Sequence, residues 1–193
     1  PSLSNQLSTL LAVARLASGD IEPQYPDFPI AALLDRIRPE FEGVARSAGI
    51  GLSFVPTSAW VRSDLHLLET VLRNLISNAI RYTPTGRVLV GCRRRRHGLL
   101  ISVHDTGIGI ESKHLEAVFT AYYQVATDNR ARTAGIGLGL SIVERITQLL
   151  SLSREVRSTP GRGSMFAVQV PYGHSTKRGR AAGATRRGRM LVI

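Results

Sequence analysis

The sequence is poor in cysteine, in aromatic residues and in long apolar runs, and each shortage excludes a class of protein. The single cysteine, Cys92, excludes an internal disulfide and a cysteine-based metal cluster. Aromatic residues make up only 6% of the 193 residues, so the core must be mainly aliphatic. No run approaches the roughly 18 apolar residues of a membrane-spanning helix, so we expect no membrane contact by this chain. One thiol fits a reducing compartment, and we expect a cytoplasmic location whether or not a longer parent protein is anchored in a membrane.

Acidic residues are also scarce, and the formal net charge of +11 raises the question of nucleic-acid binding. Six basic residues lie in the low-complexity stretch 173–189, and four more form the run Arg93 to Arg96. The rest of the chain is therefore nearly neutral. Because charge runs are usually solvated, we expect no nucleic-acid partner, and we interpret 173–189 as a basic linker.

Hydrophobic periodicity predicts helices and short strands in irregular alternation. The expected helices are 1–18, 30–48, 65–82, 112–119 and 138–150, and the expected strands lie in 49–56, 60–64, 87–105 and 153–171. The segment 87–105 is predicted to hold two strands joined by an arginine-rich turn. Ser63 or Asp64 can cap the helix at 65, and Pro39 indicates a kink or boundary in the helix at 30. This mixture predicts an α+β fold, a two-layer sandwich in which helices cover one face of a mixed sheet.

Two asparagines in the predicted helix 65–82 are candidates for a metal site. Asn74 and Asn78 lie one helical turn apart, to one side of the apolar stripe. Asparagine is a mediocre helix former, so two on one face call for a use. Its amide oxygen is a neutral, hard ligand of the kind that Mg²⁺ accepts. A pair of exposed polar residues without a ligand is the alternative.

Two glycine-rich segments follow. In DTGIGI, Asp105 ends a strand and could accept an amino proton from a flat base packed on the glycine backbone, although a simple turn is the alternative. In RTAGIGLGLSIVERI, the glycines Gly135, Gly137 and Gly139 precede a helix. Their spacing fits neither a dinucleotide fingerprint nor a Walker A loop. A helix N-terminus after such a loop can bind phosphate through its amides, and a hinge without a ligand is the alternative.

The order of these segments resembles the ATP-binding catalytic domain of sensor histidine kinases, which belongs to the Bergerat-fold family of gyrase, Hsp90 and MutL. NLISNAIRYTPTG resembles the N box, DTGIGI the first glycine box, VFTAYYQV the F box and GIGLGLSIVERI the second glycine box. TPGRGSMFAVQVP resembles the closing hairpin of that domain. The resemblance covers residues 30–172. It implies a kinase that donates the γ-phosphoryl group of ATP to a histidine on a dimerisation hairpin, with ATP and Mg²⁺ as its ligands.

The resemblance also implies roles for individual residues. Asn78 would coordinate Mg²⁺, Asn74 would support the metal and its waters, and both count as catalytic. Asp105 would accept a hydrogen bond from the adenine amino group, and an ATP lid would extend from about residue 123 to 134. The implied ATP-binding residues are Asn74, Asn78, Arg81, Tyr82, Asp105, Gly107, Gly109, Gly135, Gly137, Leu138 and Gly139. Arg81, Gln124 and Ile136 depart from the usual lysine, arginine and threonine of the family.

The flanking segments imply a longer parent protein. Residues 1–18 resemble the end of the second helix of a dimerisation hairpin, 19–29 a linker, and 190–193 the first strand of a receiver domain in a hybrid kinase. No histidine precedes His66, so we expect the chain to bind Mg·ATP without phosphorylating itself. The implied partners are the phosphoacceptor hairpin, a receiver domain or response regulator, and a second copy of the full-length protein. The alternatives are a non-catalytic nucleotide sensor and a hydrolase branch of the family, which usually carries glutamate where Asn74 stands.

Overall fold

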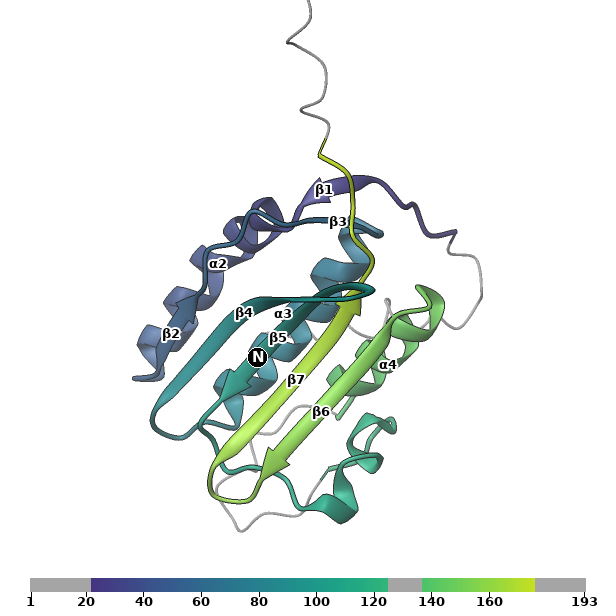
Figure 1. Ribbon diagram of the computed structural model, residues 1–193. Helices are drawn as coiled ribbons and strands as arrows, with labels where there is room; N and C mark the ends of the chain where they lie inside the picture. The colour runs from purple at the N-terminus through teal and green to yellow at the C-terminus, as the bar shows by residue number, and fades with distance from the viewer. Residues whose placement is uncertain (1–21, 125–136, 176–193) are drawn as a thin grey trace, which may run out of the picture.

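The computed structural model describes residues 22–124 and 137–175. In these residues, a five-stranded sheet forms one layer and three helices on one of its faces form the other (Figure 1). The elements in chain order are β1 (Asp27–Pro29), α2 (Ile30–Ser47), β2 (Gly51–Phe54), β3 (Trp60–Arg62), α3 (Leu65–Arg81), β4 (Arg87–Arg95), β5 (Gly98–Asp105), η1 (Ser112–His114), η2 (Ala117–Phe119), α4 (Gly139–Leu149), β6 (Ser153–Thr159) and β7 (Gly163–Val170).

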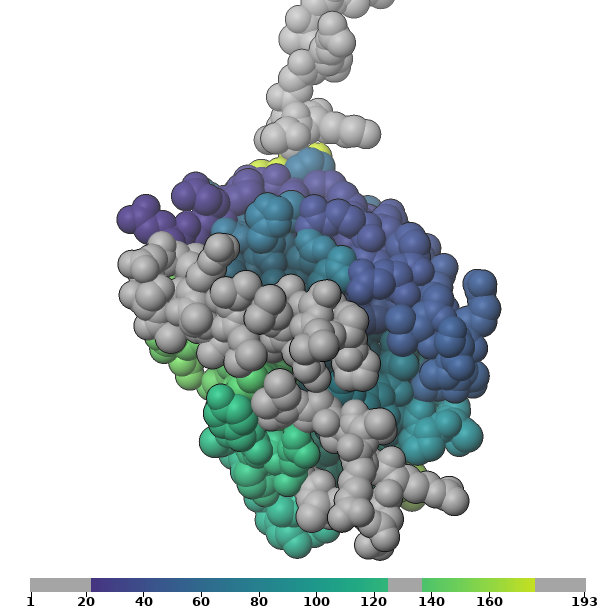
Figure 2. Space-filling model, turned by 180° about the vertical axis from the view of Figure 1, so that it is seen from behind, coloured from purple at the N-terminus to yellow at the C-terminus, as the bar shows by residue number. Residues whose placement is uncertain are grey.

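The large sheet has the strand order β2-β4-β5-β7-β6. β2 and β4 are parallel, and the other neighbouring pairs are antiparallel. Figure 2 views the helical side, where the purple-to-blue α2 forms one flank and the green segment with η1, η2 and α4 lies on the other. The prediction of a mixed sheet covered on one face by helices is therefore confirmed.

A second, two-stranded sheet of β1 and β3 lies at one end of the molecule (Figure 1). β1 falls within residues 19–29, which the sequence had placed in a linker. The chain after β7 also joins this sheet: Gly173 N–H donates to the Trp60 carbonyl (2.9 Å), and Tyr172 bridges to Val61. These contacts extend the folded unit on both sides of residues 30–170.

α3 packs between α2 and α4 and carries much of the core. Its buried side chains recur every three or four residues, as Leu68, Val71, Leu72, Leu75, Ile76, Ala79 and Ile80. A fully buried side chain of this size contributes about 1.5–3 kcal/mol. Asp64 caps the helix by accepting the N–H groups of His66 (3.0 Å) and Leu67 (2.9 Å). The packing and the cap together fix which side of α3 Asn74 and Asn78 occupy.

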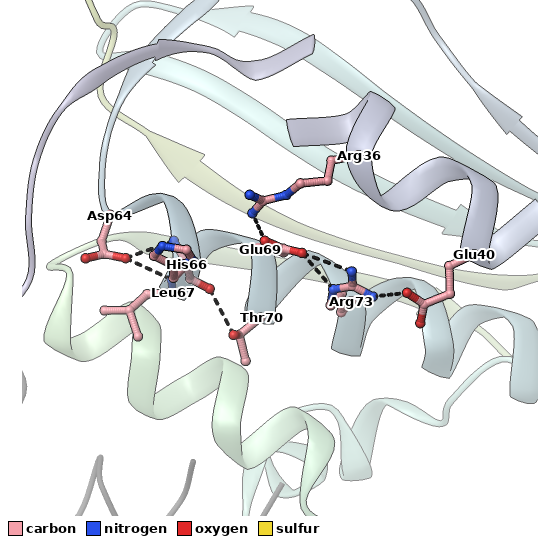
Figure 3. Close-up of polar contacts among 8 residues, drawn as sticks. All are labelled: Arg36, Glu40, Asp64, His66, Leu67, Glu69, Thr70 and Arg73. Carbon is pink, nitrogen blue, oxygen red and sulfur yellow. Dashed lines mark hydrogen bonds and ion pairs between the residues drawn. The ribbon is translucent and has the colours of Figure 1, made fainter. Parts of the chain in front are cut away.

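Ion pairs join the outer surfaces of α2 and α3 (Figure 3). Glu69 of α3 accepts Arg73 one turn further on (3.0 Å) and Arg36 of α2, and Arg73 also reaches Glu40 of α2. Arg73 therefore forms ion pairs with two carboxylates. Surface pairs of this kind are worth up to about 1 kcal/mol each, so the aliphatic packing beneath them dominates the contact.

The predicted pair of strands in 87–105 is confirmed: β4 continues through Arg95 and pairs with β5 from Gly98, so the arginine run forms part of the turn at Arg96 and His97 and its flank. One local prediction is wrong. The segment 112–119 is not one helix but two separate 3₁₀ turns, η1 and η2. Pro39 does not form a helix boundary, because α2 continues through it to Ser47.

Candidate functional site

The two asparagines of α3 face the beginning of α4. The Asn74 amide nitrogen donates to the Thr70 carbonyl one turn earlier (2.8 Å), which holds this side chain in place. A Cβ built on Gly139, the first residue of α4, would lie 3.0 Å from the Asn74 amide oxygen. The same Cβ would lie 3.5 and 3.6 Å from the amide nitrogen and oxygen of Asn78. Predicted residues from two distant segments therefore meet, and glycine at position 139 allows the helix start to approach both amides closely.

The start of α4 is built to expose backbone N–H groups. Its N-cap residue, Leu138, provides no side-chain hydrogen bond to the first turn, and none of the first-turn residues is acidic. Leu138, at the N-cap, is buried in the core, so its side chain anchors this end while its backbone stays at the site. Gly137 has φ of 76°, and its carbonyl accepts the N–H of Tyr122 (3.0 Å). Uncapped N–H groups and the helix dipole make such an end attractive to anions. Gly135 and residues 125–134 of the expected lid lie outside the described residues.

Asp105 ends β5 and is held by backbone donors. Its Oδ1 accepts the N–H groups of Gly107 (2.9 Å) and Ser164 (3.1 Å). Burial raises the pKa of this carboxyl above its ordinary value, and the two N–H groups and the nearby His104 oppose that rise in part. Over the described residues, Oδ2 has no hydrogen-bond partner. The carboxyl therefore presents one oriented acceptor.

The two glycines of DTGIGI are needed by neighbouring backbone. A Cβ on Gly107 would lie 2.1 Å from the Tyr82 carbonyl oxygen, and one on Gly109 would lie 2.1 Å from that of Thr159. Between them, Ile108 N–H donates to the Tyr82 carbonyl (3.1 Å). The segment is thus wedged between the end of α3 and the β6–β7 turn. This packing requires both glycines whether or not a base approaches them.

The last turn of α3 joins the two halves of the site. The Asn78 carbonyl accepts the N–H of Tyr82 (2.9 Å), so the asparagine pair and the Asp105 loop share one helix end. Tyr82 is half-buried at this C-cap, and Arg81 beside it is exposed. The structure thus brings Asn74, Asn78 and Gly139 together, and it places Asp105, Gly107 and Tyr82 in an adjoining group.

Gly163 and Ser164, which were not among the predicted site residues, support Asp105 from the β6–β7 hairpin. Ser164 supplies one of the two N–H donors, and a Cβ on Gly163 would lie 2.0 Å from the Asp105 carbonyl oxygen. Gly163 also has φ of 107°, which favours glycine. The pair of glycines in TPGRGS was the sequence signal for this role, because Gly163 packs against the backbone of Asp105 as well as closing the β6–β7 turn.

The donor set narrows which metal this site can hold. Across residues 22–124 and 137–175 there is no group of three histidine, cysteine or acidic residues that could hold a metal ion. The amide oxygens beside Gly139 suit a hard cation such as Mg²⁺, which keeps waters and takes its other ligands from phosphate oxygens. Because Gly139 has no side chain, the backbone at the start of α4 comes close to both amides. In the same described ranges, no helix combines the length and apolarity that crossing a bilayer requires.

Known proteins share this sequence pattern and this fold. The profile of the family described as histidine kinase-, DNA gyrase B-, and HSP90-like ATPase matches residues 63–174. The sensor protein SrrB of Staphylococcus aureus is 33% identical over 171 residues, which is 88% of this chain and 29% of that protein. The chain therefore spans less than a third of the length of this relative.

Solved structures agree with the match. Full-length ShkA, crystallised in complex with AMPPNP, superposes with a TM-score of 0.75 at 27% identity over 86% of this chain and 35% of that one. The histidine kinase AdeS of Acinetobacter baumannii has a TM-score of 0.70 at 22% identity, over 88% of this chain and 78% of that one, and supports the fold alone. The family profile covers more than half of the residues, and it includes both asparagines, Asp105 and the start of α4. The chain belongs to the family of histidine kinase-, DNA gyrase B- and HSP90-like ATPases, in its histidine kinase branch.

Proposed function

We propose that this chain binds Mg·ATP and serves as the catalytic domain of a sensor histidine kinase, donating the γ-phosphoryl group to a histidine on a separate dimerisation hairpin. The observation that carries the proposal is the meeting of Asn74 and Asn78 with Gly139 at the uncapped start of α4. A pair of amides and a helix N-terminus that face each other suit a phosphate chain with its cation. This is the arrangement that phosphoryl transfer requires, since positioning and charge neutralisation supply most of its catalysis.

Asp105 would orient the other end of the nucleotide. Its Oδ1 is committed to two backbone donors, which leaves Oδ2 to accept an amino hydrogen of adenine. Because the carboxyl is bonded to both the glycine loop and the β6–β7 hairpin, it needs no rearrangement to do so. Ile108, exposed beside it, offers apolar surface to a flat base.

Asn78 and Asn74 would hold Mg²⁺ through amide oxygens and water. When bound, the ion would draw phosphate oxygens together and neutralise part of their charge. The first-turn N–H groups of α4 would orient the phosphates through hydrogen bonds. Arg81 would add an exposed positive charge next to the asparagine pair. None of these groups activates water, which suits transfer to a protein side chain.

The phosphoacceptor hairpin, a receiver domain or response regulator, and a second copy of the full-length protein complete the proposed system. AMPPNP is bound by the related ShkA, and we extend nucleotide binding to this chain on the strength of the asparagine pair and Asp105.

Calorimetry with Mg·ADP and Mg·ATP tests the binding step. We expect saturable heat for the wild-type chain and its loss in Asn78→Ala and Asp105→Asn, while Arg96→Ala, in the β4–β5 turn, behaves as wild type. Absence of heat at millimolar nucleotide would contradict the proposal.

A second assay separates a kinase from a nucleotide sensor. The chain is mixed with a purified histidine-kinase dimerisation hairpin and ATP labelled at the γ-phosphate. We expect acid-labile label on the hairpin histidine. Binding without such transfer to any hairpin tested would favour the sensor.

A further inference from the structure

Arg154 connects three elements that meet near the start of α4. It lies on the helix-facing side of β6, opposite Val168 of β7. Its side chain is 23% exposed, so most of this charged group is covered by protein. A mostly covered arginine on the inner face of an edge strand needs partners, and it has three.

The partners come from two segments on either side of residues 125–136. The guanidinium donates through Nε to Glu144 of α4 and through Nη2 to Glu116, next to η2, at 3.1 Å. It also lies over the ring of Phe119 in η2, with 3.9 Å from Cζ to the ring centroid. Phe119 in turn packs edge-on against Phe166 of β7 (6.1 Å between centroids).

Both segments lead directly to the glycines of the site. Glu144 lies on α4 just beyond its first turn, which begins at Gly139. Three residues after Phe119, the N–H of Tyr122 donates to the Gly137 carbonyl (3.0 Å). The contacts therefore form a closed circuit from Arg154 to Phe119, Tyr122, Gly137, α4 and back through Glu144 to Arg154.

The hydrogen bonds of Arg154 constrain the position of α4 in a way that its apolar contacts do not. α4 also packs through Ile142, Val143 and Ile146, and apolar contacts are not directional. A guanidinium has a rigid planar fork that reaches two carboxylates in fixed directions. The bonds of Arg154 therefore add directional contacts to α4 beside the apolar packing.

We propose that Arg154 is a positioning residue, which holds the start of α4 against the asparagine pair by tying α4 and the η2 segment to the sheet. The consequence for nucleotide binding rests on the proposed function. The consequence for the start of α4 does not, because it concerns hydrogen bonds of the chain itself.

Arg154→Met tests the inference, with Arg73→Met as a matched control. Arg73 is also an arginine shared between two glutamates at a helix contact, with its side chain 34% exposed, but it joins α2 to α3. We expect both variants to lose a similar amount of melting temperature. Only Arg154→Met should raise the Kd for Mg·ATP by about tenfold. Arg154→Lys should recover part of the loss, because an ammonium keeps the charge without the fork.

Amide hydrogen exchange without nucleotide gives an independent reading. The N–H of Tyr122 and that of Ile142, which donates to the Leu138 carbonyl (3.0 Å), report on the start of α4. Both should exchange faster in Arg154→Met than in Arg73→Met. Unchanged exchange at these amides would overturn the inference, as would an Mg·ATP affinity within about twofold of wild type. A wild-type chain that binds no nucleotide would overturn the proposed function instead, with the exchange result still deciding the role of Arg154.

Discussion

Gly139→Ala separates the contribution of Gly139 to folding from its contribution to the site. Alanine in a helix is more favourable than glycine by about 0.5–1 kcal/mol, since glycine loses more backbone freedom on folding. The new methyl would lie 3.0 Å from the Asn74 amide oxygen, which must give way by a few tenths of an ångström. That shift strains the 2.8 Å bond from Asn74 to Thr70, and it offsets part of the helix gain. We expect unfolding free energy within about 1 kcal/mol of wild type, or a melting temperature within about 2–4 °C.

Nucleotide affinity should respond differently. The methyl occupies the space between both asparagines and the helix start, so we expect the Kd for Mg·ADP to rise by at least about tenfold, or about 1.4 kcal/mol. Thermal denaturation and calorimetry on the same preparations measure the two quantities.

Gly43→Ala is the matched control for this experiment. Gly43 lies within α2, and a Cβ there would meet nothing within 4 Å. This variant should be about 0.5–1 kcal/mol more stable than wild type with unchanged affinity. If Gly139→Ala binds Mg·ADP as wild type does, the space beside the asparagines is not a binding feature, and the reasoning fails.

Three further predictions concern stability and reactivity. Asp64→Ala removes the acceptor for two N–H groups of α3 and should cost about 1 kcal/mol in urea unfolding, whereas Asp64→Asn should keep most of it. Asp105 has a raised pKa in the folded state, so the folded protein binds this proton more tightly than the unfolded one. Wild-type stability relative to Asp105→Asn should therefore rise as pH falls through the raised pKa and decline as pH increases, and a difference independent of pH would contradict this. Burial raises the pKa of Cys92 to about 11, so alkylation at pH 8 should be about a hundredfold slower than for a free thiol, and rapid labelling of native protein would refute it.

Local patterns were enough to predict α3 and the placement of its asparagines. The expected helix 65–82 matches Leu65–Arg81, because apolar spacing and a capping residue are encoded within a few neighbours. Because they are four residues apart, Asn74 and Asn78 lie on the same face of that helix. Their contact with Gly139 could not be predicted from spacing, since it depends on how α4 packs beside α3.

Other features depend on contacts between distant residues. The four identical arginines hide the alternation of a strand, so the extent of β4 becomes clear only from its pairing with β5. Gly107 and Gly109 were expected to make room for a base, yet the backbone at Tyr82 and Thr159 already requires them. Arg154 has no signature in the sequence, because a charged residue in an edge strand is ordinary until its partners are known.

The small sheet at the end of the molecule has a mechanical consequence. β1 precedes the helical layer and residues 171–173 follow the large sheet, yet both lie on β3, one on each side. The incoming and outgoing segments are thus fastened to one strand, at the end away from the arrowhead of β5, where Asp105 lies (Figure 1). Tension between these segments would load the hydrogen bonds of β3 in shear and would not pass through the asparagine pair or Asp105. A domain attached before residue 22 or after residue 175 could then turn against this one while the geometry around Gly139 stays unchanged.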